Sequence, residues 1–178
     1  MRITRSLLQV AFKAVQVAFP ARPAYAHCDI PCGIYDPHMA QLAALTVVRM
    51  NQLIQALETP AGDASPEQRN TYVAQLSRYT KVKEEHAELC KHELRIIWGD
   101  YFRPEHLEQY PDLHNLFFQA MKLASRNRQA IDMEAAQGLL SHVQNIAEVF
   151  WKTKNAGVKR QASLQTAGGE LVYPVPQQ

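Results

Sequence analysis

The chain has 178 residues, with 19 Lys or Arg, 17 Asp or Glu and a formal net charge of +2. The first 26 residues contain four basic residues and no acid, so the rest of the chain carries a net charge of −2. Because the positive balance belongs to this leader alone, we expect no nucleic acid as a partner. No apolar stretch is long enough to span a membrane, and the odd number of cysteines argues against a framework of disulfides.

Residues 1–26 form a predicted leader that a peptidase removes. Ala24-Tyr25-Ala26 has the small-residue pattern of a processing site, and cleavage after it makes His27 the new N-terminus. Polar residues, Lys13 among them, interrupt the apolar stretch that a secretory signal needs. The leader is therefore better described as an amphipathic pro-segment, with a weak export signal as the alternative.

Residues 27–37 concentrate metal-binding groups at the start of the processed chain. Their sequence is His27-Cys28-Asp29-Ile30-Pro31-Cys32-Gly33-Ile34-Tyr35-Asp36-Pro37. The terminal amine, the amide nitrogen of Cys28 and the two sulfurs favour a flat arrangement around one ion. Planar nitrogen and sulfur donors indicate Ni(II) or Cu(II) rather than zinc, which prefers a tetrahedron, and the His27 imidazole is left as an axial ligand.

Two simpler interpretations of Cys28 and Cys32 stay open on this evidence. They fit a disulfide in an exported protein, or two ligands of a zinc site that distant histidines complete. Pro31 fixes its own φ, and Gly33 accepts backbone angles closed to other residues. Together they favour a bend that brings both sulfurs to one ion.

Residues 38–154 show helical spacing of apolar side chains. A first helix is predicted to run to about residue 58, and a second from Ser65, the predicted N-cap, to about residue 98. Glycine and prolines break the pattern over 99–111, a third helix follows, and a fourth runs from about 131 to 154. The apolar positions expected in the core include Met39, Ala43, Val47, Ile54, Tyr72, Leu76, Tyr79, Leu89, Leu94, Phe117, Ala120, Leu140, Val143 and Phe150.

Four helices with short connections predict an all-α fold, an up-down four-helix bundle with an N-terminal metal-binding hook. The expected division is 1–26 as the leader, 27–37 as the hook, 38–154 as the bundle and 155–178 as a weakly ordered tail. Cys90 lies in a strongly helical stretch and is expected to be a small core residue rather than a third ligand.

The sequence of residues 27–37 resembles the N-terminal hook of the nickel superoxide dismutases, differing from it only by aliphatic exchanges. Four further stretches resemble that family, namely Glu-Leu at 88–89 with Lys-His at 91–92, Trp-Gly-Asp-Tyr-Phe-Arg-Pro at 98–104, Tyr-Pro-Asp-Leu-His at 110–114 and Phe-Trp-Lys-Thr-Lys at 150–154. The resemblance covers roughly residues 27–154. It implies nickel as the cofactor, one ion per subunit, with His27, Cys28 and Cys32 as its ligands.

The resemblance also implies roles for residues around the metal. Tyr35 and Tyr101 match the two tyrosines that flank its open face, and Asp29 matches an acid that orders the hook. One departure concerns the groups that support the axial imidazole, because Ala43 and His86 stand where the family commonly has a glutamate and an arginine. Such supporting groups orient and tune metal-binding histidines. We expect His86, or an ordered water, to replace part of that support.

The activity implied by the resemblance is the conversion of superoxide to dioxygen and hydrogen peroxide by Ni(II)/Ni(III) cycling. It further implies a homohexamer, a dedicated peptidase that removes the leader, and a cytoplasmic enzyme, with export to the periplasm as the alternative. The competing function is a nickel or copper carrier without catalysis. Such a carrier would use the same ligands but would need neither the axial imidazole nor the flanking tyrosines.

Overall fold

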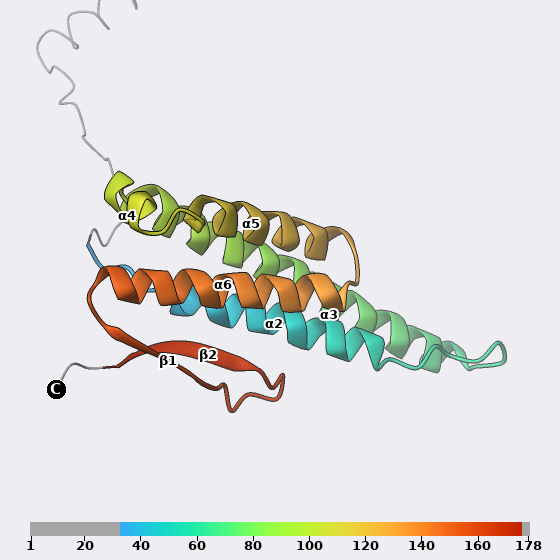
Figure 1. Cartoon of the computed structure of the whole chain (residues 1–178). Coiled ribbons are helices and arrows are strands. Elements are labelled where there is room, and N and C mark those ends of the chain that lie inside the picture. The colour runs from blue at the N-terminus through green and yellow to red at the C-terminus, as the bar shows by residue number, and fades with distance from the viewer. Residues whose placement is uncertain (1–32, 176–178) are drawn as a thin grey trace, which may run out of the picture. The chain divides into compact units, whose positions relative to one another are not determined.

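The structure is a computed structural model that describes residues 33–175. Its elements in chain order are α2 (His38–Gln55), α3 (Pro66–Ile96), the π-helix η1 (Ile97–Tyr101), α4 (Pro104–Gln109), α5 (Leu113–Gln129), α6 (Met133–Thr153), β1 (Gly157–Ala162) and β2 (Glu170–Val175) (Figure 1). The described chain is therefore mostly helical, as the spacing of its apolar residues predicts. None of its helices is long and apolar enough to cross a membrane within the described residues.

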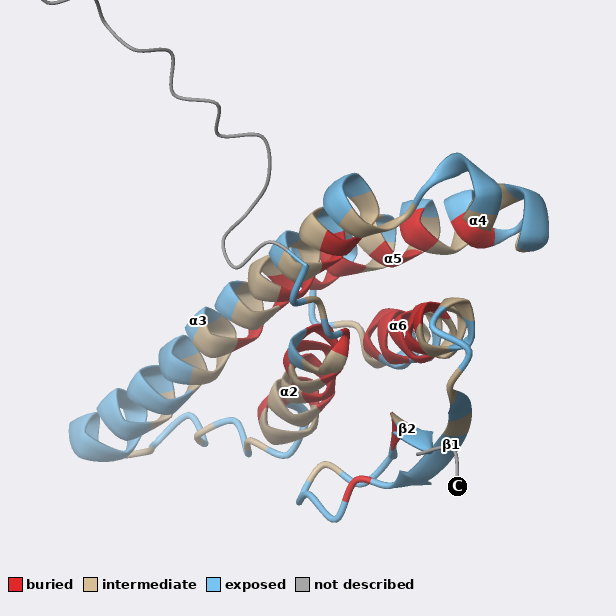
Figure 2. Ribbon diagram, turned by 90° about the vertical axis from the view of Figure 1, so that its left-hand side faces the viewer, coloured by how far each residue is buried: buried red, intermediate tan, exposed pale blue. Residues whose placement is uncertain are grey.

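The four long helices share one core. α2 packs against α3 and α6, and α5 packs against the same two helices. Buried residues lie on the faces that meet, while the outer faces are exposed (Figure 2). Small and branched side chains fill this core, among them Ala44, Val47, Ala87, Leu94, Phe117, Ala120, Leu139, Val143 and Phe150. Alternating small and large residues let helices approach closely without voids.

Local sequence signals set the helix ends. The Ser65 hydroxyl accepts a hydrogen bond from the Gln68 backbone N–H, and the Gln68 side chain accepts one from the Ser65 N–H, so the predicted capping box at the start of α3 is confirmed. At the start of α6, the Asp132 carboxylate accepts a hydrogen bond of 2.9 Å from the Ala135 N–H. That bond holds the pKa of Asp132 below its usual range, with Arg126 nearby as a further cause.

The first half of α3 departs from the predicted core. The fully buried residues of this 31-residue helix all lie in its second half, from Lys83 to Leu94. Tyr72, Leu76 and Tyr79 are only partly buried. The apolar stripe is present but is only half covered within the described residues, so the helical spacing was right and the assignment of this stretch to the core was wrong.

Lys83 holds α3 against the end of α5. Its side chain is 1% exposed, and its ammonium donates hydrogen bonds to the backbone carbonyls of Asn127 and Ala130. These carbonyls belong to the last turn of α5, where backbone acceptors lack helical partners and a positive charge is favoured. Burial lowers the pKa of Lys83, in spite of the charge of Glu84 beside it.

The C-terminal segment is not the weakly ordered tail that the sequence predicts. Asn155, with φ 55°, ends α6, and the chain then forms an antiparallel hairpin in which Gly157 pairs with Val175 and Ala162 with Glu170. Gly168 and Gly169, both at φ 73°, lie in the turn that joins the two strands over residues 163–169. Of the residues that indicated disorder, Gly168 and Gly169 are thus turn residues, and Pro174 lies in β2 opposite Val158. The expectation of an all-α chain is corrected to a mostly helical one.

Polar side chains of the helices attach this hairpin. Gln41 on α2 is fully buried, and its amide both donates to the Val172 carbonyl (3.1 Å) and accepts from the Val172 N–H (2.7 Å). Gln144 on α6 donates to the Glu170 carbonyl. Leu171 and Val172 are each 1% exposed, so β2 buries these two side chains, and Gln41 pairs with the backbone of Val172, while Val175 at the end of the strand is exposed.

Candidate metal centre

The predicted ligands His27, Cys28 and Cys32, and the acid Asp29, lie outside the described residues. The description begins one residue after Cys32. Gly33 has φ 87°, a region that side-chain-bearing residues rarely adopt. Gly33 therefore adopts a backbone angle of the kind that the sequence analysis expected it to accept, while the predicted bend of the hook lies outside the described residues.

Tyr35 and Tyr101 are brought together by the fold. Their ring centroids lie 5.8 Å apart with the planes at 57°, although Tyr35 precedes α2 and Tyr101 ends η1. η1 is one π-helical turn, in which the Phe102 N–H bonds to the carbonyl of Ile97 five residues earlier. Such insertions change the direction of the side chains that follow and are frequent at functional sites. The two tyrosines predicted to flank one metal site do lie next to each other.

The Tyr101 ring is enclosed by aromatic side chains. Its centroid lies 4.4 Å from that of Phe150 on α6 and 5.2 Å from that of Phe102. His106 on α4 stacks on it, with the ring planes at 20° and the centroids 5.7 Å apart. Because neighbours on several elements contact the ring, its orientation is set by the packing of the core rather than by its own backbone alone.

Two residues at the end of α6 contact Tyr101 through polar groups. The hydroxyls of Tyr101 and Thr153 lie 2.7 Å apart, and the Thr153 hydroxyl lies 2.7 Å from the Phe150 carbonyl oxygen. The Lys154 ammonium lies 5.3 Å from the Tyr101 ring centroid and 5.1 Å from that of Phe150. Tyr101 therefore has a positive charge beside its ring, which attracts anions.

Sequence reasoning assigned no role to Thr153 or Lys154. The segment 150–154 carried part of the family resemblance, but nothing in its spacing indicated that it reaches Tyr101 on a different element. The contact depends on how the end of α6 packs against η1, which helical periodicity does not reveal.

Ala43 and His86 face one cavity. This cavity has a volume of about 450 Å³ and is also lined by Arg49, Leu89 and the hairpin turn at 165–167. Ala43 is 1% exposed, and the Nδ1 atom of His86 lies 2.9 Å from the Val82 carbonyl oxygen. A carbonyl only accepts hydrogen bonds, so Nδ1 carries a proton and Nε2 of the neutral ring is an acceptor. The two positions of the predicted supporting pair thus lie together.

Cys90 does not contribute a ligand. It is fully buried in α3, and burial raises the pKa of its thiol to about 12, so the thiolate that a metal needs is disfavoured. Among the described residues no group of three or more His, Cys, Asp or Glu side chains is placed to hold a metal ion. The prediction that Cys90 is a core residue is confirmed.

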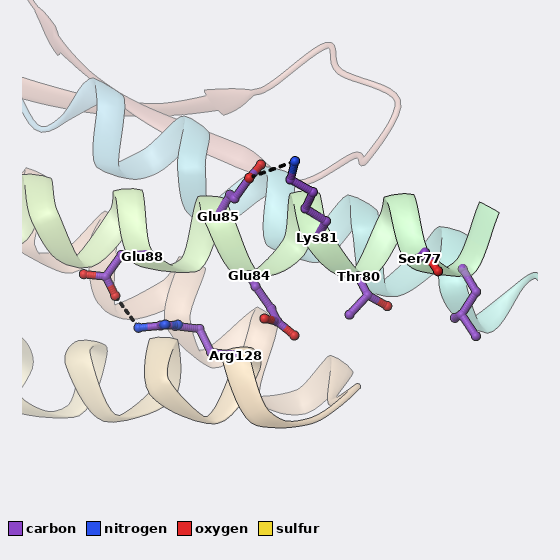
Figure 3. A pocket seen from close by; sticks show the side chains of 8 residues that line it. Ser77, Thr80, Lys81, Glu84, Glu85, Glu88 and Arg128 are labelled. Atoms are coloured by element: carbon purple, nitrogen blue, oxygen red, sulfur yellow. Dashed lines mark hydrogen bonds and ion pairs between the residues drawn. The ribbon is translucent and has the colours of Figure 1, made fainter. Parts of the chain in front are cut away.

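A surface groove between α3 and α5 is the wrong place for an anionic substrate. It has a volume of about 720 Å³ and is lined by Glu84, Glu85 and Glu88, with Lys81 and Arg128 paired to two of these acids (Figure 3). The side chains of these ion pairs are largely exposed. This groove is a solvated helix face, and the tyrosine pair at the other end of α3 is the better candidate site.

Comparisons of this chain with known proteins all point to a single protein family. Residues 22–154 match the family model described as nickel-containing superoxide dismutase. Superoxide dismutase [Ni] of Streptomyces seoulensis and that of Streptomyces coelicolor are each 37% identical to this chain over 131 residues, which is 74% of this chain and 90% of the relative.

Solved structures give the same result. A crystal structure of Ni-containing superoxide dismutase after partial X-ray-induced reduction superimposes with a TM-score of 0.62 at 36% identity, over 73% of this chain and 100% of the other. A native nickel superoxide dismutase structure gives a TM-score of 0.60 at 34% identity, over 72% and 99%. The family match ends at residue 154, just before the hairpin.

Proposed function

Because this chain belongs to the family of nickel-containing superoxide dismutases, we propose that its metal centre is formed by His27, Cys28 and Cys32 and is completed by the tyrosine pair. The enzyme is a superoxide dismutase, and its cofactor is nickel. The non-catalytic carrier considered from the sequence is thereby disfavoured. The observation that carries the placement of the site is the contact between Tyr35, three residues after Cys32, and the distant Tyr101.

The donor set fits the metal. Thiolate and nitrogen ligands are those that soft and borderline metals prefer, and all three proposed ligands fall within the range of the family match. Three residues of extended chain span at most about 11 Å, so covalent connectivity keeps Cys32 near Tyr35. His27 contributes its amine and its imidazole, Cys28 its amide nitrogen and sulfur, and Cys32 its sulfur.

Nickel, when bound, supplies the one-electron chemistry that turns two superoxide ions and two protons into dioxygen and hydrogen peroxide. The residues of this chain supply access, charge and hydrogen bonds. Tyr35 and Tyr101 line the approach and position small molecules there, and Lys154 makes this approach attractive to an anion. Asp29 orders the hook by accepting hydrogen bonds from its backbone.

His86 is the proposed support of the axial imidazole. With Nδ1 engaged by the Val82 carbonyl, Nε2 is an acceptor in the cavity beside Ala43, and an acceptor is what a metal-bound imidazole N–H requires. Replacement of His86 by alanine should change the axial nitrogen splitting of the nickel signal. An unchanged splitting and unchanged activity would remove His86 from this role.

The finer architecture and the assembly are also proposals. We take the four long helices as an up-down bundle with the hook at its N-terminal end, and six such chains as the assembled enzyme. The partly buried stripe of Tyr72, Leu76 and Tyr79, together with Val73 at 58% exposure, supports burial of α3 between chains. Sedimentation analysis would test the mass of six chains. The proposed location is the cytoplasm.

Removal of the leader is proposed to gate activity, because only then does His27 offer a free amine. The test compares a protein that begins at His27 with a matched protein that retains Ala26. The first should give a rhombic Ni(III) paramagnetic resonance signal split by one axial nitrogen, together with fast superoxide decay by pulse radiolysis. The second should give neither. Full activity and tight nickel binding with Ala26 present would contradict the proposal.

Substitution of the sulfur ligands completes this test. Cys28→Ser and Cys32→Ser should each abolish the redox signal, because an alkoxide or hydroxyl stabilises the higher oxidation state less than a thiolate. Cys90→Ser is the matched control, since its thiol is fully buried in α3 and the residue is not part of the hook sequence. It should leave the signal unchanged, provided the variant is folded.

A further inference from the structure

A chain of hydrogen bonds connects Tyr101 to the end of α6. The Tyr101 hydroxyl lies 2.7 Å from the Thr153 hydroxyl, and the Thr153 hydroxyl lies 2.7 Å from the Phe150 carbonyl oxygen. All three groups are partly buried, so these bonds are shielded from exchange with bulk water.

The number of available protons fixes which group donates in each of these two hydrogen bonds. A hydroxyl has a single proton, and a carbonyl oxygen can only accept. Thr153 must therefore donate its proton to Phe150, and it has none left for Tyr101. The bond between Tyr101 and Thr153 then requires the proton of Tyr101, which leaves the tyrosine oxygen with lone pairs but no proton to offer elsewhere.

We propose that Thr153 is a positioning residue that holds the Tyr101 hydroxyl as a hydrogen-bond acceptor toward the reacting species. This rests on the proposed placement of Tyr101 at the open face of the metal. Superoxide is an anion without a proton and needs donors. In this arrangement Tyr101 does not bind superoxide by donation, and it accepts from protonated species instead, namely water and the hydrogen peroxide product.

The surroundings of Tyr101 keep this arrangement in place. Phe150, Phe102 and His106 contact the ring, so the ring does not swing to a new partner. The superoxide anion is then attracted by a positive charge rather than by the Tyr101 proton. The Lys154 ammonium, which lies 5.3 Å from the centroid of the Tyr101 ring, supplies that charge. The C-terminal end of α6 thus sets both which way the Tyr101 hydroxyl donates its proton, through Thr153, and the charge beside the Tyr101 ring, through Lys154.

The test uses Thr153→Val, which keeps the side-chain shape but removes the hydroxyl, and Thr153→Ser, which restores it. Tyrosine labelled with ¹³C at the ring carbon bearing the hydroxyl reports by NMR whether that hydroxyl donates or accepts. Tyr101→Phe identifies the Tyr101 signal among the six tyrosines that remain when the protein begins at His27. The KM and kcat for superoxide are measured by pulse radiolysis on the nickel-loaded proteins.

In the unsubstituted enzyme we expect the signal of a donating hydroxyl. In Thr153→Val the Tyr101 signal should shift, and the KM should fall about threefold to tenfold because the released proton becomes available to the substrate anion. In Thr153→Ser both the signal and the KM should return to the original values. A purely structural role of Thr153 would predict a loss of kcat without this rescue pattern.

Two results would overturn the inference. One is an unchanged Tyr101 signal in Thr153→Val, and the other is a signal in the unsubstituted enzyme that marks Tyr101 as the acceptor of the Thr153 proton. A shifted signal with unchanged kinetics in both Thr153→Val and Tyr101→Phe would instead overturn the placement of Tyr101 at the substrate. The direction of the hydrogen bond would then stand while that part of the proposed function failed.

Discussion

The helical region and the C-terminal hairpin are held together in different ways. Helices α2 to α6 meet through apolar side chains, with Leu139 and Phe150 fully buried among them. The hairpin buries Leu171 and Val172, but amide side chains from the helices make its closest attachments, above all Gln41. The family match ends at 154, so the proposed ligands and the tyrosine pair lie within it and the hairpin lies beyond it, although the turn of the hairpin lines the cavity at Ala43 and His86.

The two regions of this chain are therefore stabilised by different interactions, the helices by apolar burial and the hairpin by hydrogen bonds as well. The helical region depends on total burial and would tolerate similar apolar residues of the same volume. The hairpin depends on a few hydrogen bonds whose loss leaves backbone groups unpaired in a buried place. Substitutions should therefore act globally in the first region and locally in the second.

The largest effect is expected in the helical core. Leu139→Ala removes a fully buried side chain and should lower the free energy of unfolding by about 3 to 5 kcal/mol, because it loses burial and leaves a cavity. Chemical denaturation with helical circular dichroism measures this loss. A change below about 1 kcal/mol would break the picture of a tightly packed core.

Leu171→Ala is the matched substitution in the hairpin, at 1% exposure. It should cost about 2 kcal/mol, less than Leu139→Ala, because the hairpin can detach before the helices unfold and so limits the loss. Amide hydrogen exchange should accelerate in β1 and β2 while the helical amides stay protected. Uniform acceleration over the whole chain would show instead that the two regions unfold as one.

Gln41→Ala tests the polar attachment alone. The substitution leaves the Val172 N–H and carbonyl without their partner and should cost about 1 to 3 kcal/mol. Gln52→Ala is the matched control on the same helix, because Gln52 makes only one partly buried bond to the hairpin, to the Ala167 carbonyl, and its amide oxygen accepts a second bond from Arg49 on α2 itself. Its effect should be smaller when both proteins are compared by thermal unfolding, and equal effects would argue against the special role of Gln41.

Lys154→Gln tests whether the positive charge beside Tyr101 promotes the reaction with superoxide. Removal of the ammonium near Tyr101 should lower kcat/KM for superoxide about twofold to fivefold at low salt and flatten its dependence on ionic strength. Lys122→Gln is the control, since Lys122 lies at the same 5.3 Å from a different ring, that of Phe118 on α5. An equal loss in both variants would indicate total charge rather than the position of Lys154.

The smallest effect concerns the pH dependence of stability. Asp132 has a pKa held below its usual range, chiefly by the Ala135 N–H, so its contribution is fully present above the unfolded value and is lost as the pH falls through the folded one. Asp132→Asn keeps a capping oxygen and should flatten the fall of the melting temperature below about pH 4. Asp112→Asn, at a helix start without a side-chain cap, should leave the fall unchanged.

Sequence patterns were reliable where local physics decides the structure. The Ser65 capping box needs only neighbours in the chain, and the apolar spacing of α5 and α6 reflects helical geometry alone. They failed for the tail and for the first half of α3. Short strands gain their order from the helices that they pack against, and an apolar stripe does not reveal whether its partner lies in the same chain.

The sequence by itself determined the family, the proposed ligands and the mostly helical character, because a local run of donors and a repeating spacing are properties of the chain. Only the tertiary structure decided that Tyr35 meets Tyr101, that Thr153 and Lys154 reach the same ring, and that Gln41 pairs with the backbone of β2. These contacts join residues far apart in sequence. They arise from how faces of separate elements pack, and no local pattern encodes that packing.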